Sequence, residues 1–590
     1  MKRSSSEYQL LTGIFFRLLP YQILLLIINA ANSIVDSLCA SNFVGQEAMT
    51  AMGLYAPMDH FLYAISIMLV SGSQLLCGNF MGRNQREAVE GIFSVDLLVA
   101  GVIGLVTTLV LGLSALTDMT RFLFANTADR MVFNQYLTGQ SLGLPALIMG
   151  QQLFAFLSME NQKKRTMIAS LCCIATNAVL DLVLIAVLKL GTLGLGLASA
   201  TSMWVFFAVQ AQYYMSGKSD LRFSFKGADF RQIAQIFRRG YSGALSRFVE
   251  MFRAIIVNML ILQFVGSVGL SSFAAVNSVM AVLWPVIFGM LAVMRMLLSI
   301  SIGEEDHRSV VNIIHIAIRY GLLIATGIAA VLFVLAEPLT CMFFRDPADP
   351  IYRMTISAFR ILPWCMPFSI ISLDMAGYAQ AMEKKFLSIV LPILDGAVFV
   401  VAFSLILIPS FGMNGLYIAN VLNGLMCCLF ILFYAWHVRR HFPRSLEDIL
   451  DLPADFGTTE DQRIDISVRS MSEVTNVSKQ VIAFCRERSI DEHRSTFAGL
   501  ALEEMAGNIV RHGFSHDHKH HSIDIRVTHK GDDVILRMRD NCIAFNPSDA
   551  MKLMEPEDIT RHVGFRIVCR IAKDIRYQNL LGLNVLTIRI

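Results

Sequence analysis

The sequence predicts a mainly α-helical membrane protein that ends in a soluble α/β sandwich. Hydrophobic residues make up 55% of the 590 residues and charged residues 16%, whereas roughly a quarter of the residues in soluble domains are charged. Long apolar segments follow one another up to about residue 437, and more polar sequence with shorter periodicities follows them. These observations divide the chain into a membrane part and a soluble tail.

Twelve apolar segments are long enough to cross a bilayer, which requires about 20 helical residues. They span residues 14–40, 48–78, 91–117, 133–158, 166–189, 193–216, 240–264, 270–302, 312–336, 353–382, 386–409 and 413–437. Lys and Arg gather in alternate loops, and the positive-inside rule places these loops and both termini in the cytoplasm. We therefore expect a multi-pass protein of the bacterial cytoplasmic membrane, with its first helix as an uncleaved signal.

An internal repeat relates the two halves of the membrane part. NFVGQEAMTAM at residue 42 is similar to QFVGSVGLSSF at 263, and GRNQREAV at 82 is similar to GEEDHRSV at 303. One interval separates four pairs of glycines, which are Gly45 and Gly266, Gly82 and Gly303, Gly191 and Gly412, and Gly194 and Gly415. The repeat predicts two six-helix bundles of equal topology, residues 1–216 and 240–440, joined by a cytoplasmic loop at 217–239.

The soluble tail is expected at residues 463–590, after a polar linker at 441–462. RIDISVR alternates like a strand, and SIDIRVTHKGDDVILRMRD has the pattern of two strands that turn at Lys530 and Gly531. LNVLTIRI is expected to close the sheet as an edge strand. Helices are expected at 471–488, 492–512 and 563–574.

Four polar residues of the first bundle have a similar predicted depth in the membrane: Asp36, Asn177, Asp181 and Thr201. An acid inside a membrane helix is costly unless it is paired or functional. Asn177 and Asp181 are one helical turn apart, so they share a face. Two carboxylates, an amide and a hydroxyl suit either a proton held between acids or a sodium ion with oxygen ligands. A structural hydrogen-bond network is the alternative interpretation.

The second bundle offers two further membrane acids, Glu250 and Asp374. Arg247 and Arg253 lie three residues on either side of Glu250 and on nearly the same helix face. An arginine partner lowers the pKa of a carboxylate and favours a fixed charge over a proton carrier. We therefore rank these acids below the first-bundle site. Arg295 is another intramembrane charge, placed either to pair locally or to contact substrate.

The membrane part resembles the multidrug and toxin extrusion (MATE) family. The residues that carry the resemblance are SIVDSLCASNFVG, TNAVLDLVLI and LGTLGLGLASATS, together with the repeat of six helices. The resemblance implies a secondary antiporter that binds H⁺ or Na⁺ in the first bundle and exports a small organic substrate, expected to be cationic. Anionic and zwitterionic substrates stay open if the cavity also exposes arginine.

The tail resembles the histidine-kinase-like ATPase fold, in particular the anti-sigma-factor serine kinases. LALEEMAGNIVRHG is similar to the N box of that fold, MRDNCIAFNP to its first glycine box, and HVGFRIVCRIAKDIRY to its second. The resemblance implies ATP with Mg²⁺ as cofactor, Glu504 as the catalytic residue and Asn508 as the magnesium ligand. It also implies Asp540 as the acceptor for the adenine amino group, with Asn541 and Gly564 in the same nucleotide site.

Two positions of the tail depart from that family's pattern. Cys542 replaces the glycine that follows Asp-Asn, and His562 stands where the second box has its first glycine. Glycines in these boxes let the backbone approach phosphate closely. We therefore expect the tail to keep adenine recognition. The substitutions place phosphate binding, and with it kinase-like catalysis, in question.

Three functions are therefore compatible with the sequence. The first is an antiporter whose tail is a nucleotide-binding regulatory domain, with a regulatory protein as a possible partner. The second is a membrane-anchored serine kinase or switch module that uses the transporter half as a sensor, and the third is a lipid-linked flippase. The net charge of +3 is too small for a chain of this size to suggest a nucleic-acid partner.

Overall fold

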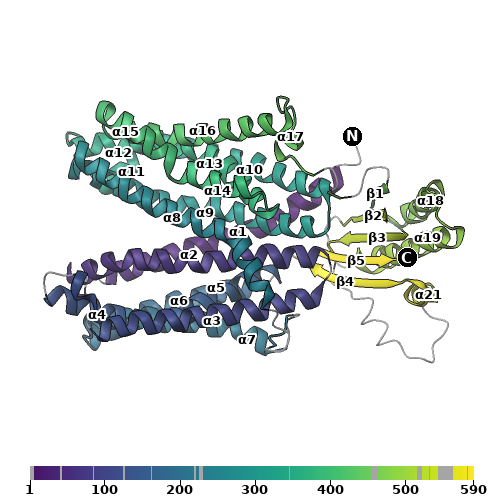
Figure 1. Cartoon of the computed structure of the whole chain (residues 1–590), viewed down its shortest axis with the longest axis horizontal. Coiled ribbons are helices and arrows are strands. Elements are labelled where there is room, and N and C mark those ends of the chain that lie inside the picture. Colours follow the sequence, from purple (N-terminus) through teal and green to yellow (C-terminus); the bar gives the residue numbers. More distant parts are fainter. Residues whose placement is uncertain are drawn as a thin grey trace.

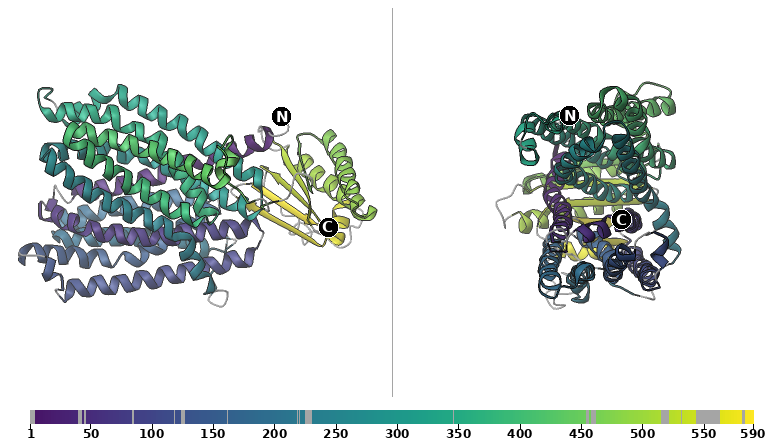
Figure 2. Two further views of the ribbon diagram at one scale, coloured as in Figure 1. Left: turned by 45° about the horizontal axis from the view of Figure 1, so that its top comes forward. Right: turned by 90° about the vertical axis from the view of Figure 1, so that its left-hand side faces the viewer.

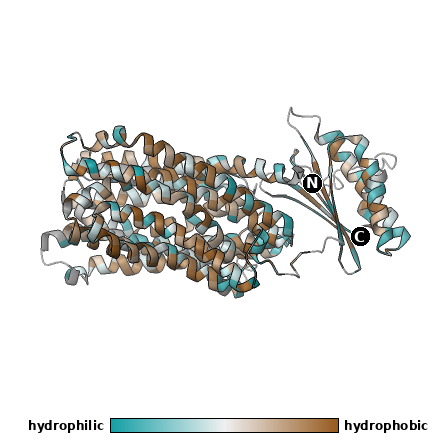
Figure 3. Cartoon of the chain, turned by 90° about the horizontal axis from the view of Figure 1, so that it is seen from above, coloured by the Kyte–Doolittle hydropathy of each residue, from teal (hydrophilic) through white to brown (hydrophobic). Residues whose placement is uncertain are grey.

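The structure is a computed structural model and describes most of the chain. It describes residues 5–39, 43–44, 46–83, 85–117, 119–123, 127–160, 162–217, 219, 221–224, 230–344, 346–453, 456–457, 462–514, 521–530, 532–542, 563–580 and 583–590. Long helices run side by side through the larger part, and a sheet domain sits at one end of them (Figure 1). Hydrophobic residues dominate the helical part, as Figure 3 shows. We call the end of the bundles that carries the sheet domain the tail-side end.

The described residues of the first bundle form seven α-helices, with a π-helical turn after the sixth. They are α1 (Ser5–Cys39), α2 (Gln46–Gly82), α3 (Arg86–Leu116), α4 (Thr127–Ser141), α5 (Leu144–Met159), α6 (Lys163–Asp181), the π turn η3 (Leu182–Val187) and α7 (Gly191–Met215). A short 3₁₀ turn, η2 (Met119–Leu123), precedes α4.

The second bundle follows the same plan. Its elements are α8 (Arg231–Phe264), α9 (Ser267–Gly303), α10 (His307–Val334), α11 (Ala336–Phe343), α12 (Pro350–Ile361), the 3₁₀ turn η4 (Leu362–Trp364), α13 (Cys365–Ala381), α14 (Lys385–Ile393), the π turn η5 (Leu394–Val398), α15 (Phe399–Phe411) and α16 (Met413–Arg439). Both bundles therefore carry a π turn in their fifth long helical segment.

The membrane helices agree with the expected segments. Among the described residues, nine helices are long and apolar enough to cross a membrane, or ten if the bent pair α4 and α5 is one span. The long helices α1 and α8 run alongside them (Figure 2). The count of twelve membrane spans stays a prediction.

The loop predicted at 217–239 is shorter than expected, because α8 already begins at Arg231. Ile233, Ile236 and Phe237 recur at helical spacing, and Ile236 is buried against the first bundle. The basic residues in this stretch favoured a loop, whereas its apolar residues have the spacing of an amphipathic helix.

Glycines let the two bundles approach each other closely near the tail-side end. A β-carbon at Gly82 would overlap the carbonyl oxygen of Ile300, and one at Gly303 would overlap that of Asn79. Gly82 and Gly303 are a pair in the sequence repeat, and each lies against the other bundle. Small residues at such positions allow membrane helices to pack backbone against backbone.

The tail is a five-stranded antiparallel sheet with helices on one face. The strand order is β1-β2-β3-β5-β4, with β1 (Arg463–Val468), β2 (Ile523–Lys530), β3 (Asp533–Asp540), β4 (Asp574–Leu580) and β5 (Leu583–Arg589). The helices are α18 (Met471–Glu487), α19 (Glu492–Gly513) and α21 (Val563–Ile571). They enclose a core with the inward side chains of the sheet, such as Leu536 and Met538.

The expectation that LNVLTIRI forms an edge strand is wrong. β5 lies between β3 and β4, and the edge strands are β1 and β4. The predicted helix at 563–574 overlaps β4 only at Asp574. The physical reason is that β5 is buried on both faces. Leu586 and Ile588 pack into the core of the tail, whereas Val585 packs into the core of the helical part.

The described residues of the stretch predicted as a linker, 441–462, pack against the second bundle. Ser445 begins the short helix α17 (Leu446–Leu450) with a capping box, and Leu450 and Leu452 are buried among membrane-helix side chains. Tyr378 Oη and Lys384 Nζ each donate a hydrogen bond of 2.7 Å to the Leu450 carbonyl oxygen.

Ion pairs attach the outer face of the sheet to the turn between α9 and α10. We call Glu304, Asp306, Arg526, Arg537 and Arg539 the docking cluster. Arg526 pairs with Asp306, Arg539 pairs with Glu304 and lies 3.4 Å from Asp306, and Arg537 lies 3.6 Å from Glu304. The side chains of Glu304 and Asp306 are only 3% and 0% exposed, so these charges are desolvated as well as paired.

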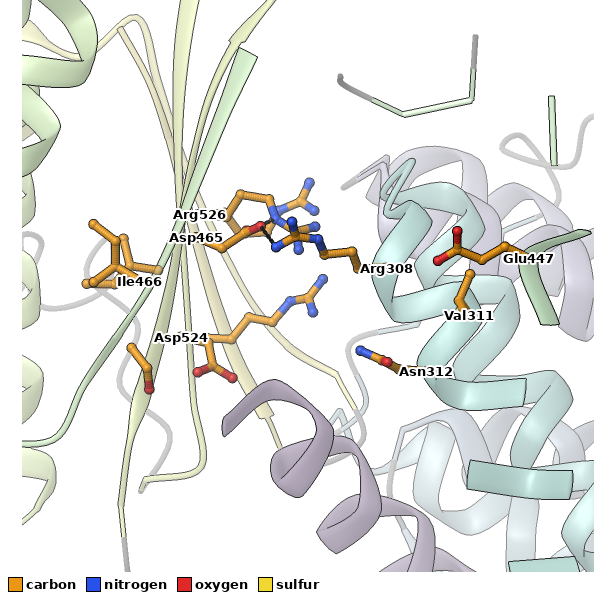
Figure 4. Close-up of a pocket in the computed structure, with 12 residues that line it drawn as sticks. Arg308, Val311, Asn312, Glu447, Asp465, Ile466, Asp524 and Arg526 are labelled. Atoms are coloured by element: carbon orange, nitrogen blue, oxygen red, sulfur yellow. Dashed lines mark hydrogen bonds and ion pairs between the residues drawn. The ribbon is translucent and has the colours of Figure 1, made fainter. Parts of the chain in front are cut away.

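Two neighbouring contacts extend this attachment. Arg308 of α10 lies 3.1 Å from Asp465, which also pairs with Arg526 (Figure 4). At the other side of the sheet, Gln578 donates a 2.8 Å hydrogen bond to the carbonyl oxygen of Met81, near the end of α2. The tail therefore contacts both bundles.

Asp306 is ionised in this arrangement. Burial by itself would raise the pKa of Asp306, but the charge of Arg526 and hydrogen bonds from Ser309 outweigh it and hold the pKa at about 2. Because this pKa lies below the ordinary value of 3.8, the contribution of Asp306 to docking is complete above pH 4 and is lost as the pH falls towards 2.

Asp306→Asn should weaken the docking of the tail without unfolding the tail, because Arg526 and Arg539 lose a buried partner. We expect a cost of about 3 kcal/mol, seen as faster amide exchange in α17 and along the outer face of the sheet. Glu492→Gln, which removes an exposed acid from α19 on the far side of the tail, is the control. Unchanged exchange in Asp306→Asn would show that the docking cluster does not hold the tail.

Candidate functional site

Three of the four predicted first-bundle residues meet in the structure. Asn177 of α6 donates a hydrogen bond from its amide nitrogen to Asp36 of α1, and Asp181 lies beside Asp36 and Cys39. Asn177 and Asp181 are fully buried. Asp181 is the last residue of α6, directly before the π turn η3, and π turns are frequent at functional sites.

This cluster has oxygen atoms with unused hydrogen-bonding capacity. Both carboxylate oxygens of Asp181 and the amide oxygen of Asn177 are buried and accept no hydrogen bond of ordinary geometry from the described residues, although Asp36 and Cys39 lie beside Asp181. Buried polar atoms are nearly always satisfied in folded proteins. Three oxygens from two side chains, next to the carboxylate of Asp36, match the ligands of a proton or a sodium ion.

Thr201 does not join this cluster. Its side chain is exposed, and its hydroxyl donates a 2.8 Å hydrogen bond to the carbonyl oxygen of Leu197 in its own helix. The depth estimate placed Thr201 at a suitable height, but the direction in which it points around α7 is set by helix packing. Depth alone does not bring a side chain into a site.

The structure reveals a half-buried carboxylate in the second bundle that the sequence argument missed. Asp395 lies in the π turn η5 and accepts hydrogen bonds from Ser372 at 3.0 Å and Asn423 at 2.8 Å. Asp96 of α3 was also missed, and it is fully buried and bonded to Ser73 at 2.6 Å. An acid within an apolar run, as in LPILDGAVFV, was a sufficient signal for both.

Glu250 forms the local ion pair that its sequence surroundings suggested. Arg247 donates a 2.9 Å hydrogen bond to Glu250, and its guanidinium lies over the rings of Tyr63 in the first bundle and Phe288 in the second. Arg247 is therefore held by an acid and by two aromatic rings. Glu250 thus has a structural partner in Arg247.

Asp374 is buried and Arg295 is half-buried in the second bundle. Asp374 is 2% exposed, and one of its carboxylate oxygens has no partner among the described residues. The Nε atom of Arg295 likewise has none within the described part of the chain. The structure therefore leaves an acid and a base in this bundle with capacity to bind another group.

In the tail, the predicted nucleotide residues lie on α19, on β3 and just after it. Glu504 and Asn508 are half-buried and one turn apart on α19, so they share a face. Asp540 is 3% exposed and accepts hydrogen bonds from Asn584 at 2.8 Å and from the backbone nitrogen of Cys542 at 2.9 Å. Burial raises the pKa of Asp540, and these hydrogen bonds oppose that change.

The glycine boxes are only partly described. Asn541 lies 2.8 Å from the His521 ring, and a β-carbon at Gly513 would lie 2.9 Å from the Cys542 sulfur, so Cys542 packs against the end of α19. Gly564 falls in the first turn of α21. The rest of the first glycine box after Cys542, and His562 in the second, lie outside the described residues.

The comparisons with known proteins agree with this architecture. The sequence matches the MatE family over residues 23–183 and 244–406, which is more than half of the chain. The chain belongs to the MatE family. The remaining match of this MatE protein, over residues 469–590, is to the histidine kinase-like ATPase domain, so both resemblances seen in the motifs are confirmed.

Relatives and solved structures are similar to the MatE part. The probable multidrug resistance protein NorM of Chromobacterium violaceum is 25% identical over 333 residues, which are 54% of this chain and 70% of that protein. The protein of the same name from Neisseria meningitidis serogroup A is 24% identical over 360 residues, 58% of this chain and 75% of that protein. An outward-facing structure of a multidrug resistance MATE family transporter has a TM-score of 0.67 at 19% identity and covers 74% of this chain and 98% of its own.

Glu250→Gln should lower thermal stability or expression more than it alters ion coupling. The substitution leaves the charge of Arg247 without its acid, at a cost of about 1 kcal/mol for a partly exposed pair. The measurement is melting temperature and expression level beside transport per folded protein, with Glu337→Gln, an exposed acid paired to Arg360, as the control. A stable but uncoupled Glu250→Gln protein would instead make Glu250 a coupling residue.

Proposed function

We propose that this MatE protein is a secondary antiporter that exports a small organic solute in exchange for protons or sodium ions. The observation that carries the proposal is the buried cluster of Asp36, Asn177 and Asp181, with three unpartnered oxygens among the described atoms. A MatE chain with such a cluster inside its membrane part has the group that gradient-driven transport requires. The names of the NorM relatives support a multidrug or similar organic solute.

The cluster can couple ion binding to movement because α1 contacts both bundles. Asp36, near the end of α1, bonds to α6 of the first bundle, whereas Phe15 and Leu18, earlier in α1, pack into a core shared with α9 and α10. Two neighbouring carboxylates repel when both are charged, and a shared proton or a cation removes that repulsion. Binding therefore changes the forces on one end of a helix whose other end belongs to the second bundle.

We place the tail-side end in the cytoplasm. The basic loops of the sequence, such as those at Arg83 and Lys384, lie at the end that carries the tail, and α1 begins and α16 ends there as well (Figure 1). Positive loops favour the cytoplasmic side. The location proposed is the bacterial cytoplasmic membrane.

For the substrate, we favour an organic cation. Asp374 keeps one buried oxygen without a described partner, whereas the charge of Arg247 is already held by Glu250. An uncompensated acid in the membrane part attracts positive charge. Arg295 is the group that would favour an anionic or zwitterionic substrate instead.

We infer that the tail is a regulatory domain that binds a magnesium nucleotide. Asp540 is buried and hydrogen-bonded in a fixed orientation, as the acceptor for the adenine amino group has to be. Glu504 and Asn508 share a face of α19, so Asn508 would ligate magnesium and Glu504 would orient water or a hydroxyl. A regulatory protein that recognises the loaded tail is the partner we expect.

The tail adds no driving force to the ion gradient. It can favour one state of the bundles only by its difference in affinity for the two states, which is typically about 1–3 kcal/mol. Its contacts with Asp306 of the second bundle and Met81 of the first give it a route to such a difference.

Asp36→Asn should abolish gradient-driven efflux while the protein still folds and inserts, because the change removes a titratable charge and keeps the shape of the side chain. We expect uptake into inverted vesicles to fall roughly tenfold or more. Asp346→Asn, in an exposed loop, is the matched control. Transport at the wild-type rate in Asp36→Asn would remove the first-bundle site from the mechanism.

Deletion of residues 455–590 should leave basal transport intact and remove its regulation. The deletion keeps α17 and the buried Leu450 and Leu452, so the second bundle retains that packing. Loss of regulation should change the transport rate severalfold without abolishing transport. Asn508→Ala should likewise remove any response of the transport rate to nucleotide. A folded, inserted truncation with no transport, or wild-type transport driven by ATP without an ion gradient, would contradict this division of roles.

A further inference from the structure

A cavity of about 300 Å³ lies where the tail and both bundles meet. The first bundle contributes Gly82, the last residue of α2, and Arg83 after it. The second contributes Gly303, the last residue of α9, with Glu304 and Glu305 after it. The rest of the wall comes from the outer face of the sheet. Its lining residues there are Arg526, Thr528, Ile535, Arg537, Asp574, Arg576, Thr587 and Arg589.

Arginines are the most frequent residues in the described lining of this cavity. Among the described residues, five arginines and three acids line it. Three of the arginines have acids close by: Arg526 pairs with Asp306, Arg576 with Asp574, and Arg589 with Asp533. Of the other two, Arg537 lies 3.6 Å from Glu304, and Arg83 forms no ion pair among the described residues.

The side chain of Arg537 is 18% exposed and incompletely satisfied. Its nearest described acid is Glu304, at 3.6 Å, and Glu304 pairs more closely with Arg539. The Nε atom of Arg537 is buried and has no hydrogen-bond partner in the described part of the chain. Burial lowers the pKa of Arg537 to about 10, since its charge is desolvated without full compensation.

Arg83 faces the same cavity from the first bundle. Among the described residues it forms no ion pair, and the cation Arg239 of α8 is near enough for Arg83 to act on its charge. The equivalent loop of the second bundle, by the sequence repeat, carries Glu304, Glu305 and Asp306. The two loops thus have opposite charge. Arginines of the sheet pair with Glu304 and Asp306 of the second loop, whereas Arg83 of the first loop forms no ion pair among the described residues.

We propose that this cavity binds a phosphate group, held by Arg83 and Arg537 with Thr528 and Thr587 as hydroxyl donors. Guanidinium groups bind phosphate with two parallel charge-assisted hydrogen bonds. The size of the cavity admits a free phosphate or pyrophosphate, and its place at the membrane surface also admits the headgroup of an anionic lipid. The site is separate from the N box on α19 and from the Asp36 cluster.

The ligand would join parts of the molecule that move relative to each other in an antiporter. The tail is already attached to the second bundle through the docking cluster, and the phosphate would add a contact to Arg83 of the first. A ligand held by both bundles stabilises the state in which their tail-side ends are together. The inference therefore goes beyond the proposed function by naming a ligand class that acts on the tail contact.

The test is titration of the purified full chain with pyrophosphate in magnesium-free buffer, followed by isothermal calorimetry. The protein is held in vesicle discs of neutral phosphatidylcholine, and a second series adds phosphatidylglycerol. We expect saturable binding that is weakened about tenfold in Arg83→Gln and in Arg537→Gln. Arg86→Gln, an exposed arginine nearby that pairs with Glu90, should bind as the wild type does.

Arg83→Gln decides the result if Arg537→Gln disturbs docking, because Arg83 is exposed and has no described ion pair. Asn508→Ala should bind pyrophosphate normally, which separates this site from failure of the proposed nucleotide site. Arg83-dependent stabilisation by phosphatidylglycerol, with no binding of pyrophosphate, would assign the phosphate to a lipid headgroup. Equal affinity in Arg83→Gln and the wild type, or no response to either ligand, would overturn the proposal.

Discussion

The position of the tail depends on one buried carboxylate, Asp306. It begins α10 by accepting hydrogen bonds from the backbone nitrogen and hydroxyl of Ser309, at 3.1 and 2.7 Å, and it pairs with Arg526 and Arg539 of the sheet. A buried charge with one partner missing is strongly unfavourable. The carboxylate of Asp306 therefore both caps the first turn of α10 and binds the arginines of the tail. A change in one of these sets of contacts alters the other.

Close packing makes this attachment relevant to both bundles. Gly82 and Gly303 let α2 and α9 cross with almost no space between their backbones, directly beneath the sheet. Gln578 contacts the end of α2, and the docking cluster holds the turn after α9. Because a movement that separates the bundles at this end has to break one of these contacts, the tail is placed to favour one arrangement over another.

The two bundles share a local feature that helix counting does not reveal. Asp181 directly precedes the π turn of the first bundle, and Asp395 lies within that of the second. A π turn opens the regular hydrogen bonding of a helix and redirects the side chains beside it. Asp395 uses its oxygens on Ser372 and Asn423, whereas those of Asp181 have no partner among the described residues. The two bundles therefore share the π turn, but the carboxylates beside it differ in their hydrogen bonding.

The sequence by itself determined the membrane part, the repeat, the ATPase-like tail and the acids worth considering. The hydropathy of a segment and the interval between repeated glycines can be read from the amino-acid sequence. An acid within an apolar run can be recognised in the same way. The tertiary structure decided which of those groups meet. It joined Asp36, Asn177 and Asp181 but left Thr201 outside, because the rotation of a helix about its axis depends on all its neighbours. It also moved LNVLTIRI from the edge of the sheet to its interior and placed the arginines of the tail against Glu304 and Asp306. Those contacts join residues more than 200 positions apart, and no local pattern specifies them.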